Sequence, residues 1–266
     1  MRRTAHGIAP HAMNSNAGWV RYATVGASLA AGALAWEVAG HFTSGAFWAP
    51  LSATLESLAE LARSGVLARQ GFNSFELYAT GLAIAIATGA PFGLLLARLP
   101  WLRVALEDYI MVLYATPMVA LIPFILSIMG FGFAPKVLVV FLFAVFPVLY
   151  NTIEGARSIR PELIEVARAF RSSEWQLWRD VMIPYTLSFT MTGIRQAIAR
   201  GLVGMVVAEF FLSPSGLGQM IMMGSQNFDT PGMLAAIFVI VLLGVGLMDL
   251  GRFLEDRFAA WRGYNP

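Results

Sequence analysis

The sequence predicts an all-α, polytopic membrane protein with six transmembrane helices. Hydrophobic residues make up 58% of the 266-residue chain and charged residues 13%, whereas soluble domains average about 45–50% and about 25%. So few charges cannot cover the outside of a soluble fold that is this apolar. The charged residues also separate six long apolar stretches, each approaching the ~20 residues that cross a hydrocarbon core.

The six predicted spans follow from the positions of the charged residues. They run from Tyr22 to Trp36, Leu77 to Ala97, Tyr109 to Pro135, Val137 to Ile153, Pro184 to Phe211 and Thr230 to Met248. The third contains Pro117 and Pro123, which lack a backbone donor, and we expect it to be kinked or interrupted there. The segment Gly130 to Pro135 is predicted to form the turn between the third and fourth spans.

The region before the second span contains an amphipathic segment, Pro50 to Arg69. Its leucines recur at helical spacing among glutamates, which predicts a connecting helix that lies on the outer membrane surface. We divide the chain into residues 1–70, with the N-terminal tail, the first span and this segment, and a transmembrane core of residues 71–262. Ala33-Leu34-Ala35 resembles a cleavage site, but the long polar lead-in and the even number of spans favour a retained first span.

The basic residues predict the orientation of the spans. With the N-terminus inside, thirteen arginines face the cytoplasm, and only Arg63, Arg69 and Lys136 face outward. The thirteen are Arg2, Arg3, Arg21, Arg98, Arg103, Arg157, Arg160, Arg168, Arg171, Arg179, Arg252, Arg257 and Arg262. Because basic residues accumulate in cytoplasmic loops, both termini are predicted to be cytoplasmic.

The longest cytoplasmic connection, residues 154–183, is predicted to contain two short helices. Pro161 suits a first helical turn, since its missing N–H needs no partner there. Ser173 and Gln176 have the spacing of a capping box, which predicts a second helix from Ser173, with Pro184 opening the fifth span. Short helices with exposed apolar residues are marginal in water, so this loop is predicted to dock on a partner.

Residues of this loop also follow a family pattern. Glu165-Val166-Ala167, position 171 and Val181, Ile183 and Pro184 match the spacing E-A-A-x3-G-x9-I-x-L-P. Further matching stretches are Thr116-Pro117 with Leu121-Ile122-Pro123, Gly130 to Lys136, Phe146-Pro147, Gly193-Ile194-Arg195, Ala208-Glu209 and Gly216-Leu217-Gly218. Over about residues 68–262, the ordered set resembles permease subunits of binding-protein-dependent ABC importers of the type I fold, in the nitrate, sulfonate and taurine branch.

The resemblance implies partners and site residues. Coupling to an ATPase is implied for Glu165, Val166, Ala167, Phe170, Arg171, Ser173 and Trp175, and an outer gate or binding-protein contact for Gly216, Leu217 and Gly218. The implied partners are two ATP-binding subunits, a second copy of the permease and a periplasmic or lipid-anchored substrate-binding protein, with no nucleic acid. The implied location is the bacterial inner membrane.

The chain departs from the family pattern at three places. Arg171 stands where the motif has glycine, which predicts either an ordinary turn conformation or altered docking geometry. Val166 replaces the second alanine of the motif. Glu76 and Leu77 stand where the family has a basic residue at the start of the second span.

The sequence shows no ATP site of its own. A phosphate-binding loop needs G-x-x-x-x-G-K-[ST], and the only lysine, Lys136, follows Ala134-Pro135. We therefore assign this chain no catalytic residue and no cofactor, and expect the partner subunits to bind ATP and Mg. With no cysteine, and histidine only at positions 6, 11 and 41, no metal site is predicted.

Two arginines fall within the fifth span. Counted from Pro184 at ~1.5 Å per residue, Arg195 lies about 16 Å and Arg200 about 24 Å along the helix. Ionisable groups inside a membrane are functional candidates by default, so we predict a polar pathway that favours an anionic solute. The predicted pathway residues are Arg195, Arg200, Glu209, Thr116 and Pro117. The alternative is structural pairing with carboxylates such as Glu107, Asp108 or Glu209.

The resemblance thus favours a transport subunit that moves a small anion, such as a sulfonate, nitrate or a carboxylate, into the cytoplasm, although relatives of this family also carry neutral vitamin precursors. An intramembrane enzyme is disfavoured because no histidine follows position 41 and no G-x-S-x-G occurs. A gradient-driven secondary transporter stays as the alternative. Such carriers often have carboxylates near the membrane midplane, and dependence on a partner ATPase discriminates between the two.

Overall fold

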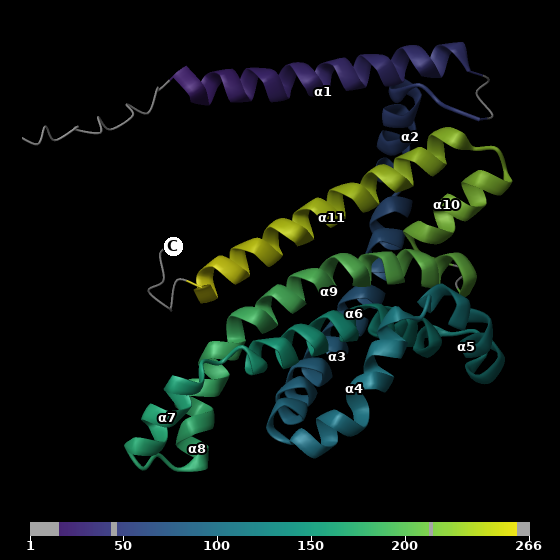
Figure 1. The fold of residues 1–266 in the computed structure, drawn as a ribbon. Coiled ribbons are helices and arrows are strands. Elements are labelled where there is room, and N and C mark those ends of the chain that lie inside the picture. The colour runs from purple at the N-terminus through teal and green to yellow at the C-terminus, as the bar shows by residue number, and fades with distance from the viewer. Residues whose placement is uncertain (1–15, 44–46, 213–214, 260–266) are drawn as a thin grey trace, which may run out of the picture.

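The computed structural model describes residues 16–43, 47–212 and 215–259, and every secondary-structure element in these ranges is helical (Figure 1). The first elements are α1 (Asn16–Phe42), α2 (Leu51–Arg63), α3 (Val66–Arg98), α4 (Pro100–Ala115), the 3-10 helix η1 (Met118–Leu121), α5 (Ile122–Met129) and α6 (Phe133–Arg157). They are followed by α7 (Pro161–Ala169), α8 (Glu174–Gln176), the π-helix η2 (Leu177–Met182), α9 (Ile183–Leu212), α10 (Leu217–Gln226) and α11 (Thr230–Ala259). The all-α prediction is confirmed. Three of the arginines predicted to be cytoplasmic, Arg2, Arg3 and Arg262, lie outside the described residues.

Helix α6 forms the centre of the fold and packs between α3 and α9. Val139, Ala144, Val148 and Thr152, spaced along α6, are each no more than 1% exposed. Around them lie the hydrophobic clusters that α3, α6 and α9 share. The central position of α6 fixes the positions of both neighbouring helices.

Glycines allow this close packing. A β-carbon added to Gly81 of α3 would lie 2.6 Å from the Val140 side chain, and one added to Gly193 of α9 would lie 2.7 Å from the Pro147 carbonyl oxygen. Helices in a membrane associate through van der Waals contact, and small residues let their backbones approach. Gly193 matters more for the packing, because a backbone atom cannot rotate away from an added methyl group.

The predicted interruption of the third span at Pro117 is confirmed. Thr116 is extended, with ψ of 133°, as expected for a residue that precedes proline. The helix α4 and the following η1–α5 pair are bent by 92° at this break. Pro123 lies in the first turn of α5 and breaks no helix there, because the N–H that it lacks would have no partner in a first turn. The turn before α6 is shorter than predicted, since α6 begins at Phe133.

Among the described residues, α3, α6 and α11 are each long and apolar enough to cross a membrane. Two bent pairs, α4 with η1–α5 and the α8–α9 run with α10, raise the number of candidate spans to five. Helix α1 has 27 residues but is not among these candidate spans. Six spans therefore stay a prediction, with α1 as the sixth.

The predicted amphipathic helix before the second span is present as α2, and it packs against α11 as well as α3. It contacts α1 through polar groups: Ser52 donates from its N–H and its hydroxyl to the Glu37 carboxylate, at 2.9 and 2.7 Å. Gly65, with φ of 73°, separates α2 from α3. The helix of the second span begins at Val66 and not at Leu77, so the proposed division at residue 70 lies inside α3.

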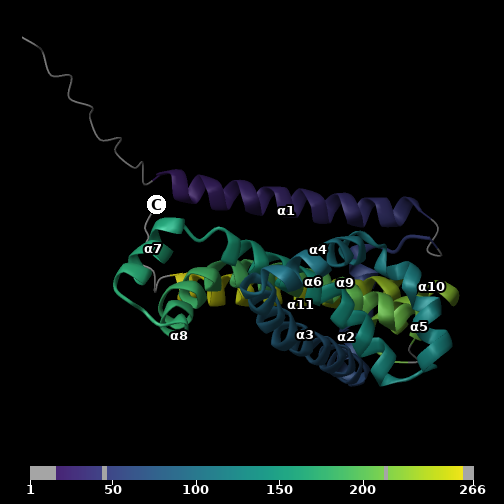
Figure 2. The same cartoon turned by 60° about the horizontal axis from the view of Figure 1, so that its bottom comes forward.

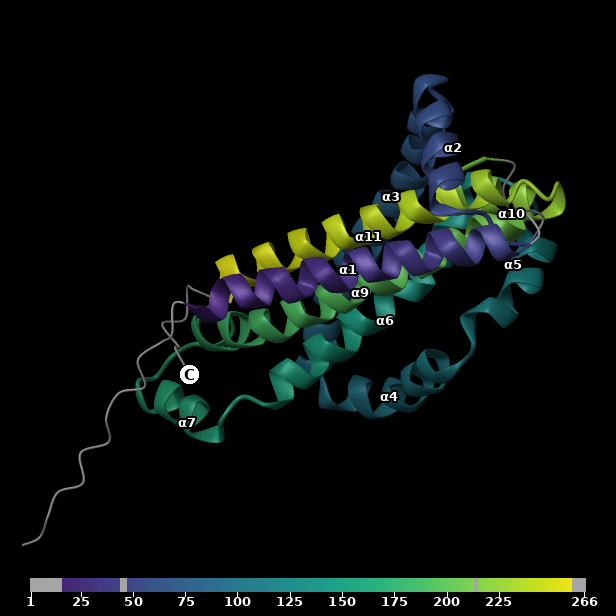
Figure 3. The same cartoon turned by 90° about the horizontal axis from the view of Figure 1, so that it is seen from above.

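The long helices separate two ends of the molecule. The short helices α7 and α8 lie together at one end, and α5 and α10 lie at the other (Figure 1, Figure 2). The start of α1 and the last turns of α11 both point toward the α7 end (Figure 3). The start of the first helix and the end of the last helix thus lie at the same end of the molecule as the predicted docking loop.

The glycine contact between α6 and α9 predicts a matched pair of variants. Gly193→Ala pushes a methyl group against the Pro147 carbonyl, whereas a β-carbon at Gly246 of α11 meets nothing within 4 Å. We expect Gly193→Ala to cost roughly 1–3 kcal/mol through overpacking. The thermal midpoint of the detergent-purified protein should fall for Gly193→Ala and stay within error of wild type for Gly246→Ala. Equal midpoints for the two variants would contradict the packing described.

Candidate translocation cavity and coupling loop

The helix α7 ends in a turn that a glycine would normally make. Arg171 has φ of 55°, in the left-handed region. The N–H of Arg171 donates to the Arg168 carbonyl at 2.9 Å, and that of Ser172 donates to the Ala167 carbonyl at 3.0 Å. These two bonds define a Schellman motif, in which glycine is the usual left-handed residue. The first expectation for Arg171, an ordinary turn, is wrong: the arginine takes the conformation of the motif glycine.

The second predicted helix of the loop, α8, starts where the sequence predicts. The Ser173 hydroxyl accepts the N–H of Gln176 at 3.3 Å, and the Gln176 side chain accepts the N–H of Ser173 at 2.7 Å. This reciprocal capping box confirms the predicted start. Pro184 does not open the next helix, because α8, η2 and α9 form one helical run from Glu174 to Leu212. The wider π turn of η2 precedes Pro184 and accommodates the ring, which would clash in a regular α-helix.

The loop of residues 154–183, for which coupling to an ATPase is predicted, is called the coupling loop. It exposes apolar side chains. Phe170 is 81% exposed, Trp175 71% and Val166 53%. Glu165, Arg171 and Ser173 are also exposed, and Ala167 is half-buried. Trp178 is turned inward, with the Arg98 guanidinium 5.1 Å from its ring centroid. The loop thus contacts the end of α3 through Trp178, while its apolar face is left uncovered by the described residues.

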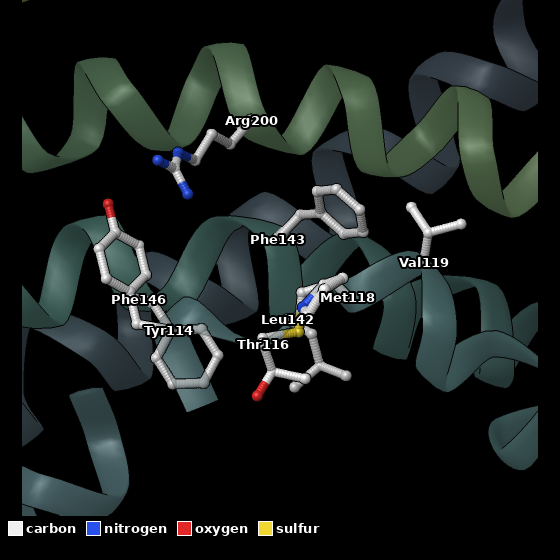
Figure 4. Close-up of a pocket in the computed structure, with 9 residues that line it drawn as sticks. Tyr114, Thr116, Met118, Val119, Leu142, Phe143, Phe146 and Arg200 are labelled. Carbon is white, nitrogen blue, oxygen red and sulfur yellow. The ribbon is translucent and has the colours of Figure 1, made fainter. Parts of the chain in front are cut away.

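A cavity of about 260 Å³ lies beside Arg200 in the middle of α9 (Figure 4). We call it the Arg200 cavity. It is lined by Tyr114, Thr116, Pro117, Met118, Val119, Leu142, Phe143, Phe146 and Arg200. The break between α4 and η1 forms one wall, and α6 forms another. Irregular backbone at membrane depth is tolerated where it lines a cavity, which fits the position of Thr116 and Pro117.

Arg200 has an aromatic neighbour but, among the described residues, no acidic partner in an ion pair. Its Cζ lies 4.9 Å from the centroid of the Tyr114 ring, a cation–π contact. None of the ion pairs among the described residues includes Arg200. The structure therefore brings together Arg200, Thr116 and Pro117, three of the five predicted pathway residues, around a guanidinium that pairs with no carboxylate in the described part of the chain.

Arg195 is arranged differently. It donates to the Glu255 carboxylate of α11 at 2.7 Å, and the Thr192 hydroxyl also donates to Glu255, at 3.3 Å. The structural-pairing alternative holds for Arg195, but with a partner that differs from the predicted Glu107, Asp108 and Glu209. Sequence spacing did not indicate this pair because the two residues lie on different helices, 60 positions apart.

Glu209 lies near the C-terminal end of α9, outside the lining of the Arg200 cavity, and is 1% exposed. It accepts the Ser74 hydroxyl and the Gly218 N–H, each at 2.7 Å. The Ser74 oxygen in turn accepts the Leu217 N–H at 2.8 Å, and the Gln70 side chain accepts the Gly216 N–H at 2.8 Å. The predicted gate residues Gly216, Leu217 and Gly218 are thus the N-terminal turn of α10, with their N–H groups satisfied by α3 and α9.

Sequence reasoning missed several residues of these sites. Ser74 and Gln70 gave no signal, since neither belongs to a local motif. Tyr114, Phe143 and Phe146 also gave none, because single aromatic residues are common in any apolar helix. These three aromatic residues can be identified as site residues only because the structure places them around one cavity. In the part of the chain that the structure describes, no group of His, Cys, Asp or Glu is arranged to hold a metal ion.

Comparison with known proteins identifies the family. A family model described as "Binding-protein-dependent transport system inner membrane component" matches residues 89–260. The chain is 36% identical over 165 residues to the riboflavin transport system permease protein RibX of Chloroflexus aurantiacus, and the match spans 62% of each chain. It is 30% identical over 201 residues to the putative aliphatic sulfonates transport permease protein SsuC of Bacillus subtilis, which covers 74% of this chain and 73% of SsuC. These names cover different solutes, so the predicted nitrate and sulfonate branch is narrower than the comparisons support.

Solved structures show the same fold. The inward-facing MetNI methionine ABC transporter matches with a TM-score of 0.62 at 18% identity, covering 72% of this chain and 95% of the other. An amino acid ABC transporter with histidines matches with a TM-score of 0.59 at 17% identity, covering 75% of this chain and 97% of the other. The chain therefore belongs to the family of binding-protein-dependent transport system inner membrane components, the permease subunits of ABC importers, and it has the type I permease fold.

Proposed function

We propose that this permease moves a small anionic solute into the cytoplasm, with Arg200 on the pathway. The observation that carries the proposal is a guanidinium beside a cavity at a helix break, with no ion-pair partner among the described residues. A cation inside a membrane span is costly unless it is paired or faces a polar path. Arg195 has a carboxylate partner, and Arg200 has none among the described residues. The guanidinium of Arg200 is therefore the better candidate to bind a solute.

The names of the relatives do not decide the solute. SsuC is named for aliphatic sulfonates, which are anions, but RibX is named for riboflavin. OpuCB of Listeria monocytogenes, which is 32% identical over 180 residues, is named for carnitine. The charge of Arg200 supports the anionic class, since it would attract an anion and repel a cation. Sulfonates, nitrate and carboxylates are the candidate solutes.

We propose that two ATP-binding subunits supply the energy by docking on the coupling loop of each of two permease copies. The exposed Phe170 and Trp175 support this, since aromatic side chains are typical anchors of protein interfaces. The Schellman turn at Arg171 and the capping box at Ser173 give the loop a defined shape before any partner binds. A substrate-binding protein outside the membrane would deliver the solute, as the family description implies.

We further propose that both termini lie in the cytoplasm. The thirteen predicted inside arginines support this orientation. So does the arrangement of the helices, because the start of α1 and the end of α11 lie toward the α7 end (Figure 3). The gradient-driven carrier is set aside, since the chain belongs to a family of ABC importer subunits.

The docking proposal predicts that Phe170→Ala weakens binding of the ATP-binding subunit. Loss of an aromatic anchor that docking would bury should reduce the subunit recovered with the tagged permease by roughly tenfold or more. The measurement is a pull-down in mild detergent, with quantitative mass spectrometry of the ATP-binding subunit and an ATPase assay.

The matched control is Phe131→Ala, at the opposite end of the molecule. Phe131 is 76% exposed, close to the 81% of Phe170, so both variants remove a similar exposed side chain. Wild type and Phe131→Ala should recover equal amounts of the ATP-binding subunit. Equal recovery with Phe170→Ala would mean that the loop is not the docking element, and a wild-type chain that binds no ATPase at all would refute the importer function.

The pathway proposal predicts that Arg200→Ala abolishes solute uptake while the complex still assembles. The guanidinium contacts Tyr114 but pairs with no carboxylate among the described residues, so its removal leaves no acidic group unpaired there. Uptake is measured in proteoliposomes that contain the whole transporter, with labelled sulfonates, nitrate and carboxylates as solutes. Normal uptake of the transported solute by an assembled Arg200→Ala complex would refute the role of Arg200.

A further inference from the structure

The walls of the Arg200 cavity are mostly aromatic and aliphatic. Tyr114 comes from α4, and Phe143 and Phe146 come from α6. Among the nine lining residues, Arg200 is the only charged one. A site built for a compact, strongly hydrated anion would present several hydrogen-bond donors, and this lining presents few. The apolar walls therefore point to a solute with an apolar part.

The aromatic side chains form a connected group. The Tyr114 ring lies 6.2 Å from the Phe146 ring at an angle of 41°, and 6.1 Å from the Tyr150 ring at 13°. Such separations allow offset-stacked and tilted arrangements, which are the favourable ones between aromatic rings. A planar ring that enters the cavity can extend this group with further contacts of the same kind.

The contact between Arg200 and Tyr114 orients the positive charge. With the guanidinium above the Tyr114 ring at 4.9 Å, one face of the group is occupied. Its N–H groups lie in the guanidinium plane, and a carboxylate or sulfonate can accept two of them side by side. Figure 4 shows Arg200 extending from α9 toward the aromatic side chains. An anionic group at Arg200 thus places the attached ring among these side chains.

The size of the cavity fits this kind of solute. A dry apolar cavity of about 150 Å³ holds benzene, and the Arg200 cavity has about 260 Å³. One ring with a carboxylate or sulfonate group fits this space. A small inorganic anion would leave the apolar wall without partner atoms, which forfeits the dispersion contacts that the wall offers.

We propose that the Arg200 cavity binds an aromatic carboxylate or sulfonate with a single ring. This inference rests on the proposed function, in which Arg200 faces the path of an anion, and it narrows the class of solute. The anionic group pairs with Arg200, and the ring packs against Tyr114, Phe143 and Phe146.

The test is a binding experiment on the wild-type permease in complex with its ATP-binding subunits, in lipid nanodiscs. Equilibrium dialysis measures labelled benzenesulfonate, with unlabelled methanesulfonate and neutral benzamide as competitors. Benzenesulfonate should bind at least about tenfold more tightly than either competitor, since each lacks one of the two contacts, the ring or the charge. Methanesulfonate that binds as tightly as benzenesulfonate would overturn the proposal.

Variants separate the two contacts. Arg200→Gln should weaken benzenesulfonate binding by about tenfold or more, whereas Arg63→Gln, an exposed charge at the end of α2, should leave it unchanged. Phe146→Leu should weaken benzenesulfonate and leave methanesulfonate unchanged, with Phe131→Leu as its control. Unchanged benzenesulfonate binding in both cavity variants would overturn the proposal, and the wild-type comparison decides even where a variant fails to fold.

The purified complex also distinguishes failure of the proposed function from failure of this inference. If no ATP-binding subunit assembles with the permease, the proposed function fails. If the complex assembles but shows no preference for the aromatic anion, this inference fails and the importer function stands.

Discussion

The close packing of α6 against α9 is the contact on which the other features depend. Gly193 lies against the Pro147 carbonyl, and a β-carbon at Gly204 would lie 2.9 Å from Phe143. Because helices in a membrane gain little from the hydrophobic effect among themselves, such contact must supply much of their association. One side of this interface carries Phe143 and Phe146 into the Arg200 cavity, and the other carries Arg200 itself. A change in the α6–α9 spacing would alter the cavity directly.

Helix α9 also links the cavity to both ends of the molecule. At one end it continues without a break through η2 into α8 of the coupling loop. At the other, Glu209 accepts the N–H of Gly218 and holds the first turn of α10. A movement imposed on the exposed Trp175 would be transmitted along one helical run to Arg200, and from there to the α10 end. If ATP-binding subunits dock on the loop as proposed, this continuous helical run joins their docking surface to the Arg200 cavity.

The sequence predicts what depends on local spacing and fails where distant residues meet. The capping box at Ser173 and the helix break at Pro117 follow from neighbours in the chain, and both are confirmed. The left-handed Arg171 is visible as a departure from a glycine motif, although its conformation needs the structure. The pairing of Arg195 with Glu255 spans 60 positions and leaves no periodic trace. The aromatic wall of the cavity was missed for the same reason: Tyr114 and Phe146 become neighbours only after α4 packs against α6.

We propose that Arg200 lies on the path of the solute, so the Arg200 cavity should open to water during transport. The chain contains no cysteine, so the permease has no other thiol that could react. A single introduced cysteine can therefore report whether water reaches its position. The most direct measurement compares Thr116→Cys, in the cavity wall, with Val245→Cys, on the outward face of α11, in the reconstituted transporter treated with a charged, membrane-impermeant thiol reagent. We expect the thiol at position 116 to react, and its rate to change when the ATPase is trapped with a nucleotide analogue. The thiol at position 245 should stay unreactive. A thiol at position 116 that is unreactive in every state, in an assembled and active transporter, would contradict this proposal.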